Sequence, residues 1–228
     1  MIFWNAQFKS YTMKRVLKYV LIMMGLIMAP HANAQIADNN KTLKISPIQF
    51  GKSYFELSME FDMNGGKSSL QISPMALLKK DNFEEFTGIQ AEIQYRSYLL
   101  RLDREETDTW MFSDIDMFAG AYALGLIFSR DYKAWYNGFG PEPITEADVT
   151  QDILAIESGV VIGVKFTLGK RVTLGFLAGG GVRYSDIQDS IEAGLNIDDY
   201  YVRDNDSVFD LGYFGVKPRL NLQLGITL

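Results

Sequence analysis

TGIQAEIQYRSYLL, residues 87–100, alternates polar and apolar side chains almost residue by residue. Successive side chains of a strand point to opposite faces, so one face would carry Gly88, Gln90, Glu92, Gln94, Arg96 and Tyr98. The other face would carry Ile89, Ala91, Ile93, Tyr95 and Leu99. Such a strand separates a polar environment from an apolar one. The alternation recurs in residues 54–62 and 216–228, which predicts a barrel built from repeated strands.

The N-terminal segment has the pattern of a secretory signal peptide. Met13 is followed by three cationic residues, an apolar run at 19–28 and the sequence Ala-Asn-Ala, which ends at Ala34. The apolar run is shorter than the roughly 20 residues that a membrane-spanning helix needs. We therefore predict that Met13 is the true start, that residues 1–34 are removed, and that residues 35–228 form one barrel domain.

Composition narrows the class of protein further. The chain has 228 residues, of which 47% are hydrophobic, and 20 glycines, which suits a single packed domain. It contains no cysteine, which excludes disulfides, a lipoprotein anchor and thiol catalysis. Removing the signal peptide, with four cationic side chains and no acids, changes the formal net charge from −6 to −10. An acidic exported chain is not expected to bind nucleic acid.

Alternation and turn signals predict about eight strands, at residues 42–49, 54–62, 68–78, 87–100, 118–130, 153–168, 171–185 and 214–228. No stretch keeps a period of 3.6 residues, so few helices are expected. The connections alternate between tight turns, at 64–66 and 169–170, and long acidic loops, at 131–151 and 186–211. This pattern predicts an all-β fold, a single closed antiparallel barrel with both termini at one rim.

A soluble barrel with an apolar cavity and a membrane barrel with an apolar exterior would both alternate in this way. Residues 118–130 discriminate between the two, because large and small uncharged side chains occupy opposite faces. We interpret the small face as the crowded interior and the large face as the lipid-facing exterior, the arrangement of a transmembrane barrel. The large face comprises Phe118, Tyr122, Leu124, Leu126 and Phe128, and the small face Ala119, Ala121, Ala123 and Gly125.

Three segments carry a resemblance to a known group of proteins: FELSMEF at 55–61, GIQAEIQYRSYLL at 88–100 and PRLNLQLGITL at 218–228. They resemble the small outer-membrane β-barrel families related to the OmpA-type transmembrane domain, in the porin-like superfamily. The resemblance covers nearly the whole mature chain and implies a location in the outer membrane of a Gram-negative envelope. These families usually end in an aromatic residue, whereas this chain keeps the apolar spacing but ends in Leu228.

Enzymes among the barrels that this chain resembles generally use histidine as a base. The only histidine, His31, lies in the predicted signal peptide, so we predict no enzyme and no catalytic residue. The acidic residues of the long loops do not match a calcium-binding loop, and the glycines at 179–181 lack the helix and Lys-Ser/Thr pair of a phosphate cradle. We therefore predict no metal site and no cofactor.

Ten charged residues fall on faces assigned to the interior: Glu56, Glu60, Glu92, Arg96, Glu157, Lys165, Arg171, Arg183, Lys217 and Arg219. Charges of both signs in a narrow lumen should pair and occlude it. The predicted function is a structural or accessory role as an outer-membrane barrel with a packed polar interior. Alternatives are a surface binding module that uses the long acidic loops, or a narrow channel for small solutes. The expected partners are outer-membrane lipid and other envelope proteins, with Gln35 near the periplasm.

Overall fold

The structure is a computed structural model. It describes residues 41–50, 54–80, 84–103, 112–136, 146–169, 171–191, 195, 197, 200–201, 207–208, 210 and 212–228. The predicted signal peptide lies outside these described residues, so its cleavage stays a prediction. No helix in the described part of the chain has the length and apolar character needed to cross a membrane.

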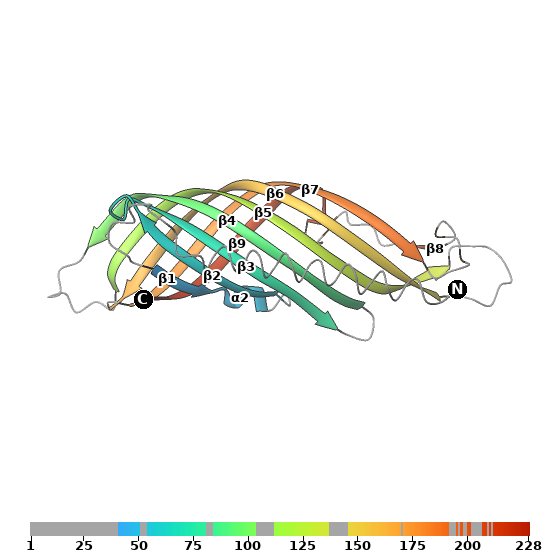
Figure 1. The fold of residues 1–228 in the computed structure, drawn as a ribbon. Coiled ribbons are helices and arrows are strands. Elements are labelled where there is room, and N and C mark those ends of the chain that lie inside the picture. The colour runs from blue at the N-terminus through green and yellow to red at the C-terminus, as the bar shows by residue number, and fades with distance from the viewer. Residues whose placement is uncertain are drawn as a thin grey trace, which may run out of the picture. The chain divides into compact units, whose positions relative to one another are not determined.

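One antiparallel sheet contains every strand of the described residues (Figure 1). The only described helix longer than an isolated residue is a single turn, α2 (Pro47–Phe50). The strands are β1 (Lys41–Ile45), β2 (Tyr54–Met63), β3 (Ser68–Lys80), β4 (Glu84–Asp103), β5 (Phe112–Tyr136), β6 (Glu146–Leu168), β7 (Val172–Ile191), β8 (Tyr200–Tyr201) and β9 (Gly215–Thr227).

Eight of these strands close into a ring. Backbone pairing runs from β1 through β2, β3, β4, β5, β6 and β7 to β9, and β9 pairs again with β1. The two-residue β8 adds to the end of β5. A ring leaves few unpaired sheet edges, which is the condition for a sheet to exist in hydrocarbon. The all-β barrel of eight antiparallel strands predicted from the sequence is thus confirmed.

The strands are longer than predicted on one side of the ring. β5 and β6 extend to Tyr136 and Glu146, so most of the acidic connection expected at 131–151 is strand. β7 likewise continues to Ile191, into the connection expected at 186–211. The extensions of β5 and β6 alternate buried and more exposed side chains, and Tyr132, Ala147 and Val149 form an apolar cluster there. Local acidity suggested a loop, but continued alternation sustains a strand.

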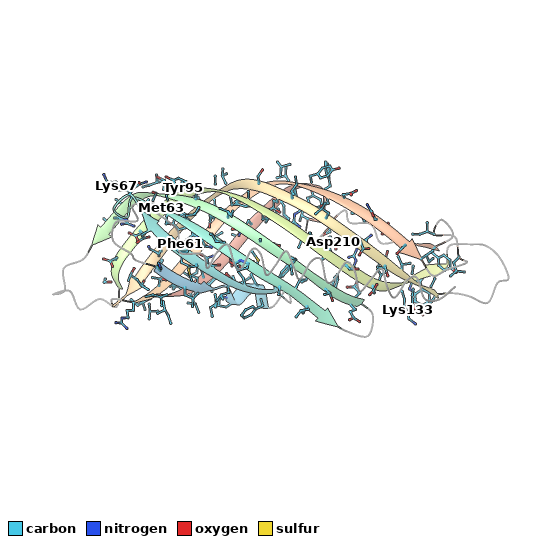
Figure 2. All side chains as sticks on the ribbon, in the orientation of Figure 1. Phe61, Met63, Lys67, Tyr95, Lys133 and Asp210 are labelled. Carbon is cyan, nitrogen blue, oxygen red and sulfur yellow. The ribbon has the colours of Figure 1, made fainter. Side chains whose placement is uncertain are left out.

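The two rims of the barrel differ. The rim with the tight turns, called here the turn rim, contains Asn64, Gly65 and Gly66 with φ of 54°, 63° and 79°, and Gly169 with φ of 59°. These left-handed conformations explain the choice of Asn and Gly. The opposite end is called the loop rim. Figure 2 shows Met63 and Lys67 at the turn rim and Lys133 toward the loop rim.

The ring has its fewest backbone pairs where its first and last strands meet. β1 was predicted to reach residue 49 but ends at Ile45, because Pro47 lacks the N–H that a strand ladder needs and begins α2 instead. β1 and β9 therefore share only the pairs from Thr42–Thr227 to Ile45–Leu224. Nearer the loop rim, among the described residues, β9 pairs with β7 alone, and α2 lies against β9 and β2. We call this junction the seam.

Glycines allow β6 and β7 to approach closely. A Cβ at Gly179 would lie 2.8 Å from Cα of Val161, and one at Gly181 would lie 2.8 Å from the carbonyl carbon of Ser158. Both distances are too short for real atoms, so larger side chains would force the strands apart. The glycines at 179–181 are explained by packing of the barrel wall.

The predicted inside and outside are correct for β2, β4 and β6. Glu60, Glu92 and Glu157 are buried in the lumen, whereas Phe55, Ile93 and Ile162 on the opposite faces are exposed. On β7, Arg183 is buried and Val182 is exposed, which also agrees with the sequence. Polar-in, apolar-out alternation therefore holds on most of the ring.

For β5 the prediction is wrong. The large residues expected to face lipid are buried in the lumen, whereas Ala121, Ala123 and Gly125 lie on the outer face. Register gives the reason: Glu92 pairs with Leu124 and Ile93 with Ala123, and directly paired residues share a face. The inward set is Phe118, Tyr122, Leu124, Leu126 and Phe128, which form the main apolar cluster with residues such as Leu77, Phe86 and Ile153.

One substitution made at two alanines tests this correction. Ala155→Leu, which enlarges a fully buried residue, should lower the free energy of unfolding by about 1–3 kcal/mol through overpacking. Ala123→Leu on the outer face should be tolerated. Urea titrations of both variants in detergent measure the difference. A larger loss at Ala123 than at Ala155 would restore the assignment made from sequence.

Candidate functional site

The polar groups of the lumen join strands that lie opposite each other. β4 and β9 are four places apart in the eight-membered ring, so they face each other across the barrel. Arg219 on β9 places Nη1 2.6 Å from Oε2 of Glu92 on β4. In the other direction, Nη2 of Arg96 on β4 donates to Oε1 of Gln223 on β9 over 3.0 Å. These two contacts span the full lumen.

Glu60 on β2 contacts four side chains of the lumen. It pairs with Lys44 of β1, and Nη1 of Arg96 lies 3.4 Å from its Oε2. The hydroxyls of Ser69 and Tyr98 donate to its Oε1. All but Tyr98 are fully buried, so the desolvation cost of the carboxylate is offset by two cations and two hydrogen bonds.

Toward the turn rim the network continues through Lys165 on β6. Its Nζ lies 3.1 Å from Oδ2 of Asp116 and donates to the hydroxyl of Tyr98 over 3.2 Å. Arg101, at the end of β4, places Nε 3.5 Å from Oδ1 of the same aspartate. Near this rim the network therefore links the neighbouring strands β4, β5 and β6, and Tyr98 connects it to Glu60 on β2.

A separate pair occupies the wall formed by β6 and β7. Arg183 donates from Nε to Oε2 of Glu157 over 2.7 Å, and its Nη2 lies 2.6 Å from the same oxygen. The hydroxyl of Tyr122 donates to Oε1 of Glu157 over 2.6 Å. This geometry satisfies both carboxylate oxygens without water.

The aromatic face of β5 covers arginines of β4, its neighbour in the ring, and of β9. The guanidinium carbon of Arg96 lies 4.6 Å from the ring centre of Phe118, and that of Arg219 lies 4.6 Å from the ring centre of Tyr122. Cation–π contact of this kind stabilises a desolvated guanidinium. The large residues of β5 therefore complete the polar network, which small residues could not do.

Arg130 forms a further polar layer nearer the loop rim. It donates to the side chain of Gln151, which in turn donates to Oδ1 of Asp189 over 2.7 Å. Its guanidinium carbon lies 5.7 Å from the ring centre of Phe86 and 5.4 Å from that of Tyr132. These rings belong to the two apolar clusters of the interior, so the layer separates them.

The structure distributes the ten charged residues assigned to the interior unevenly. Seven are buried: Glu56, Glu60, Glu92, Arg96, Glu157, Lys165 and Arg183. Arg219 is half-buried and pairs with Glu92, while Lys217 is half-buried and donates to the backbone carbonyl of Asp210. Arg171 is exposed beside the Gly169 turn, and its assignment to the lumen is wrong because β7 begins only at Val172.

Three charged members of the interior were missed: Lys44, Asp116 and Arg130. Lys44 shares a face with Thr42, opposite Leu43 and Ile45, so alternation along β1 could have found it. Asp116 and Arg130 share the face of Phe118, which was assigned to lipid. Their charges were the available signal that this face points inward.

The described residues contain no group of three or more His, Asp or Glu side chains placed to hold a metal ion. Several acids expected in loops lie in strands instead: Glu146, Asp148 and Asp152 on β6, and Asp186 and Asp189 on β7. Others lie outside the described residues: Glu142, Glu192, Asp198, Asp199, Asp204 and Asp206.

Comparison with known proteins does not assign a family. No protein-family model matches the chain, and no curated protein matches it. Among solved structures, the chain is similar to the crystal structure of CarO from Acinetobacter baumannii, with a TM-score of 0.44 and 10% sequence identity. The similarity covers 86% of this chain and 99% of the CarO chain. A likeness this distant leaves the function to be argued from the barrel itself.

Two arginines that the sequence grouped together should behave differently. Arg96→Ala removes a guanidinium that Glu60, Gln94 and Gln223 all contact, and should destabilise the barrel by about 3–5 kcal/mol. Arg171→Ala, at an exposed position, should stay within about 0.5 kcal/mol of wild type. Urea unfolding of both variants in detergent measures these losses. Equal losses of unfolding free energy in the two variants would mean that Arg96 does not belong to the network.

Proposed function

We propose that this protein is an integral outer-membrane barrel with a structural or accessory role in the envelope and no catalytic activity. The observation that supports a membrane location is the distribution of charge on the barrel surface. The outer faces of β4 to β7 carry no charged residue between the turn rim and the level of Asp131, Asp152 and Asp186. Exposed residues of this belt include Ile93, Ile127, Ile156, Val160, Ile162 and Val182.

A soluble protein would place charge outside and apolar residues inside. Here the fully buried polar residues include Glu56, Glu60, Glu92 and Arg96, while Ile162 is 66% exposed. This inversion favours hydrocarbon around the barrel. The partner we propose is therefore outer-membrane lipid, with the loop rim outside and the turn rim facing the periplasm. Other envelope proteins are proposed partners of an accessory role.

The side chains that fill the interior favour a closed barrel rather than an open channel. An eight-stranded barrel is just wide enough for its side chains to fill, whereas porins with open channels have about 16–18 strands. The contacts of Glu92 with Arg219 and of Arg96 with Gln223 cross the whole lumen. A solute would have to break these buried pairs, which favours a structural role over transport.

Cell fractionation tests the location. The full chain, expressed with its natural N-terminus, should be recovered in the outer-membrane fraction and should migrate differently on a detergent gel before and after boiling. The shift is expected because the closed ring resists detergent until heated. Recovery as a soluble periplasmic protein would contradict the proposal.

Arginine substitutions at two depths test the lipid-facing belt. Ile162→Arg, in the middle of β6, should cost about 2–4 kcal/mol in bilayers, because the charge cannot be hydrated there. Val172→Arg, at the first residue of β7 beside the turn rim, should cost at most about 1 kcal/mol. Folding titrations into liposomes measure both costs. Equal costs at the two depths would argue against a membrane around β6 and β7.

Planar-bilayer recording tests closure. The purified barrel should show no stable openings of porin size, because paired side chains occupy its interior. Arg96→Ala should increase brief openings if the protein remains folded, since it removes one of the cross-lumen contacts. Reproducible porin-sized currents from wild type would favour the alternative of a channel.

A further inference from the structure

Buried polar atoms without a hydrogen-bond partner among the described residues gather on β4 and β9. On β4 they include Oε1 of Glu92 and Nε2 of Gln94, and on β9 they include Oδ1 of Asn221 and Nε2 of Gln223. None of these four side chains is more than 3% exposed. Buried polar atoms are nearly always paired, so unpaired ones on two facing strands indicate a further hydrogen-bonding molecule.

The contacts with Arg96 and Glu56 fix which end of each amide is unpaired. Nη2 of Arg96 donates to Oε1 of Gln94 over 2.6 Å and to Oε1 of Gln223 over 3.0 Å. A guanidinium has no acceptor, so each glutamine keeps its Nε2 as the unpaired donor. Nδ2 of Asn221 donates to Oε2 of Glu56 over 3.3 Å, which leaves Oδ1 as the unpaired acceptor.

The two contacts that cross the lumen bring these atoms together. Each contact joins β4 to β9, and the bridging residues are four positions apart on both strands. Alternate residues of a strand share a face. Gln94 is therefore the inward residue between the bridges on β4, and Asn221 is the inward residue between them on β9. A donor and an acceptor, both unpaired, face each other there.

Charge balance selects a neutral molecule. Among the described side chains, Glu60 pairs with both Lys44 and Arg96, which leaves one positive charge in excess. The buried carboxylate of Glu56 supplies the matching negative charge, and the ion pair that crosses the lumen is neutral in itself. An added ion would disturb this balance, whereas a small uncharged molecule that both donates and accepts would not.

We propose that ordered water occupies the space between the two cross-lumen contacts, where it accepts from Gln94 and Gln223 and donates to Asn221 and Glu92. Buried water typically makes about 3 hydrogen bonds to otherwise unpaired polar groups, which these partners can supply. Water is also the smallest molecule that both donates and accepts, which suits side chains that are almost fully buried. The site rests on the lumen contacts alone and does not depend on the structural role proposed above.

The lining of the lumen gives this water an entrance at one end only. Polar groups continue toward the turn rim through Tyr98 and Lys165 to Arg101, whose side chain is 34% exposed. Toward the loop rim the lumen is filled by the main apolar cluster, which includes Leu126 and Phe128. Water would therefore exchange through the turn rim and stop at the cluster, so that the barrel is hydrated at its centre but closed to passage.

Nuclear Overhauser spectra of the folded barrel in detergent micelles test the proposal. The side-chain amide protons of Gln94 and Gln223 should show cross peaks to water with the sign that a long-lived bound molecule gives. Gln151 is a matched internal control, because it is also buried and accepts from an arginine, but its Nε2 donates to Asp189 over 2.7 Å. Its cross peak to water should be several-fold weaker.

One variant adds a second arm to the test. Asn221→Leu removes the acceptor at nearly unchanged volume, so it should weaken the water cross peak of Gln94 several-fold and leave Gln151 unchanged. If this variant does not fold, the wild-type comparison with Gln151 decides. The proposal would be overturned by wild-type spectra without water cross peaks at Gln94 and Gln223, by an equally strong cross peak at Gln151, or by cross peaks to detergent in place of water. An unchanged Gln94 cross peak in folded Asn221→Leu would overturn it too.

Discussion

The charge pair between Glu92 and Arg219 is the contact on which the interior depends. It joins β4 to β9 across the widest separation that an eight-membered ring allows, and the side chains involved are largely shielded from solvent. Neither charge could remain in that space alone, because desolvation would cost several kcal/mol. The lumen must therefore be filled in a way that brings opposite charges together.

That requirement accounts for the unequal walls of the barrel. β1, β2, β3 and β9 supply carboxylates, amides, hydroxyls and lysine, whereas β5 supplies large rings and aliphatic side chains. The rings of Phe118 and Tyr122 lie over the guanidinium groups of Arg96 and Arg219. Small residues on that face would leave voids beside buried charges. Alanine and glycine lie on the outer face of β5.

The sequence predicted the features that depend on alternation alone. The strand count, the antiparallel ring, and the inside and outside of β2, β4, β6 and β7 follow from side chains that differ in charge, as Glu92 and Ile93 do. It misassigned β5, where both faces are uncharged along most of their length. Alternation shows that two faces differ but not which one points inward. For β5 the charges of Asp116 and Arg130 near the ends of one face were the signal in the sequence, and pairing with β4 decides.

Other errors concern where strands begin and end. Pro47 ended β1 within a stretch that still alternates, and acidic side chains concealed the extensions of β5 and β6. Lumen contacts such as Lys44 with Glu60 could not be predicted because they depend on register between strands. The residues of the seam meet only in the folded ring, since Ser46 and Asn221 are far apart in sequence.

A double-mutant cycle between Glu92 and Arg219 tests most directly whether charges pair across the lumen. Glu92→Gln, Arg219→Gln and the double variant would be unfolded by urea in detergent and compared with wild type. Residues in contact show coupling energies of about 0.5–3 kcal/mol, and a buried pair predicts a value of about 2 kcal/mol or more. Losses that simply add, within about 0.5 kcal/mol, would show that the two side chains do not meet and would contradict a closed polar interior.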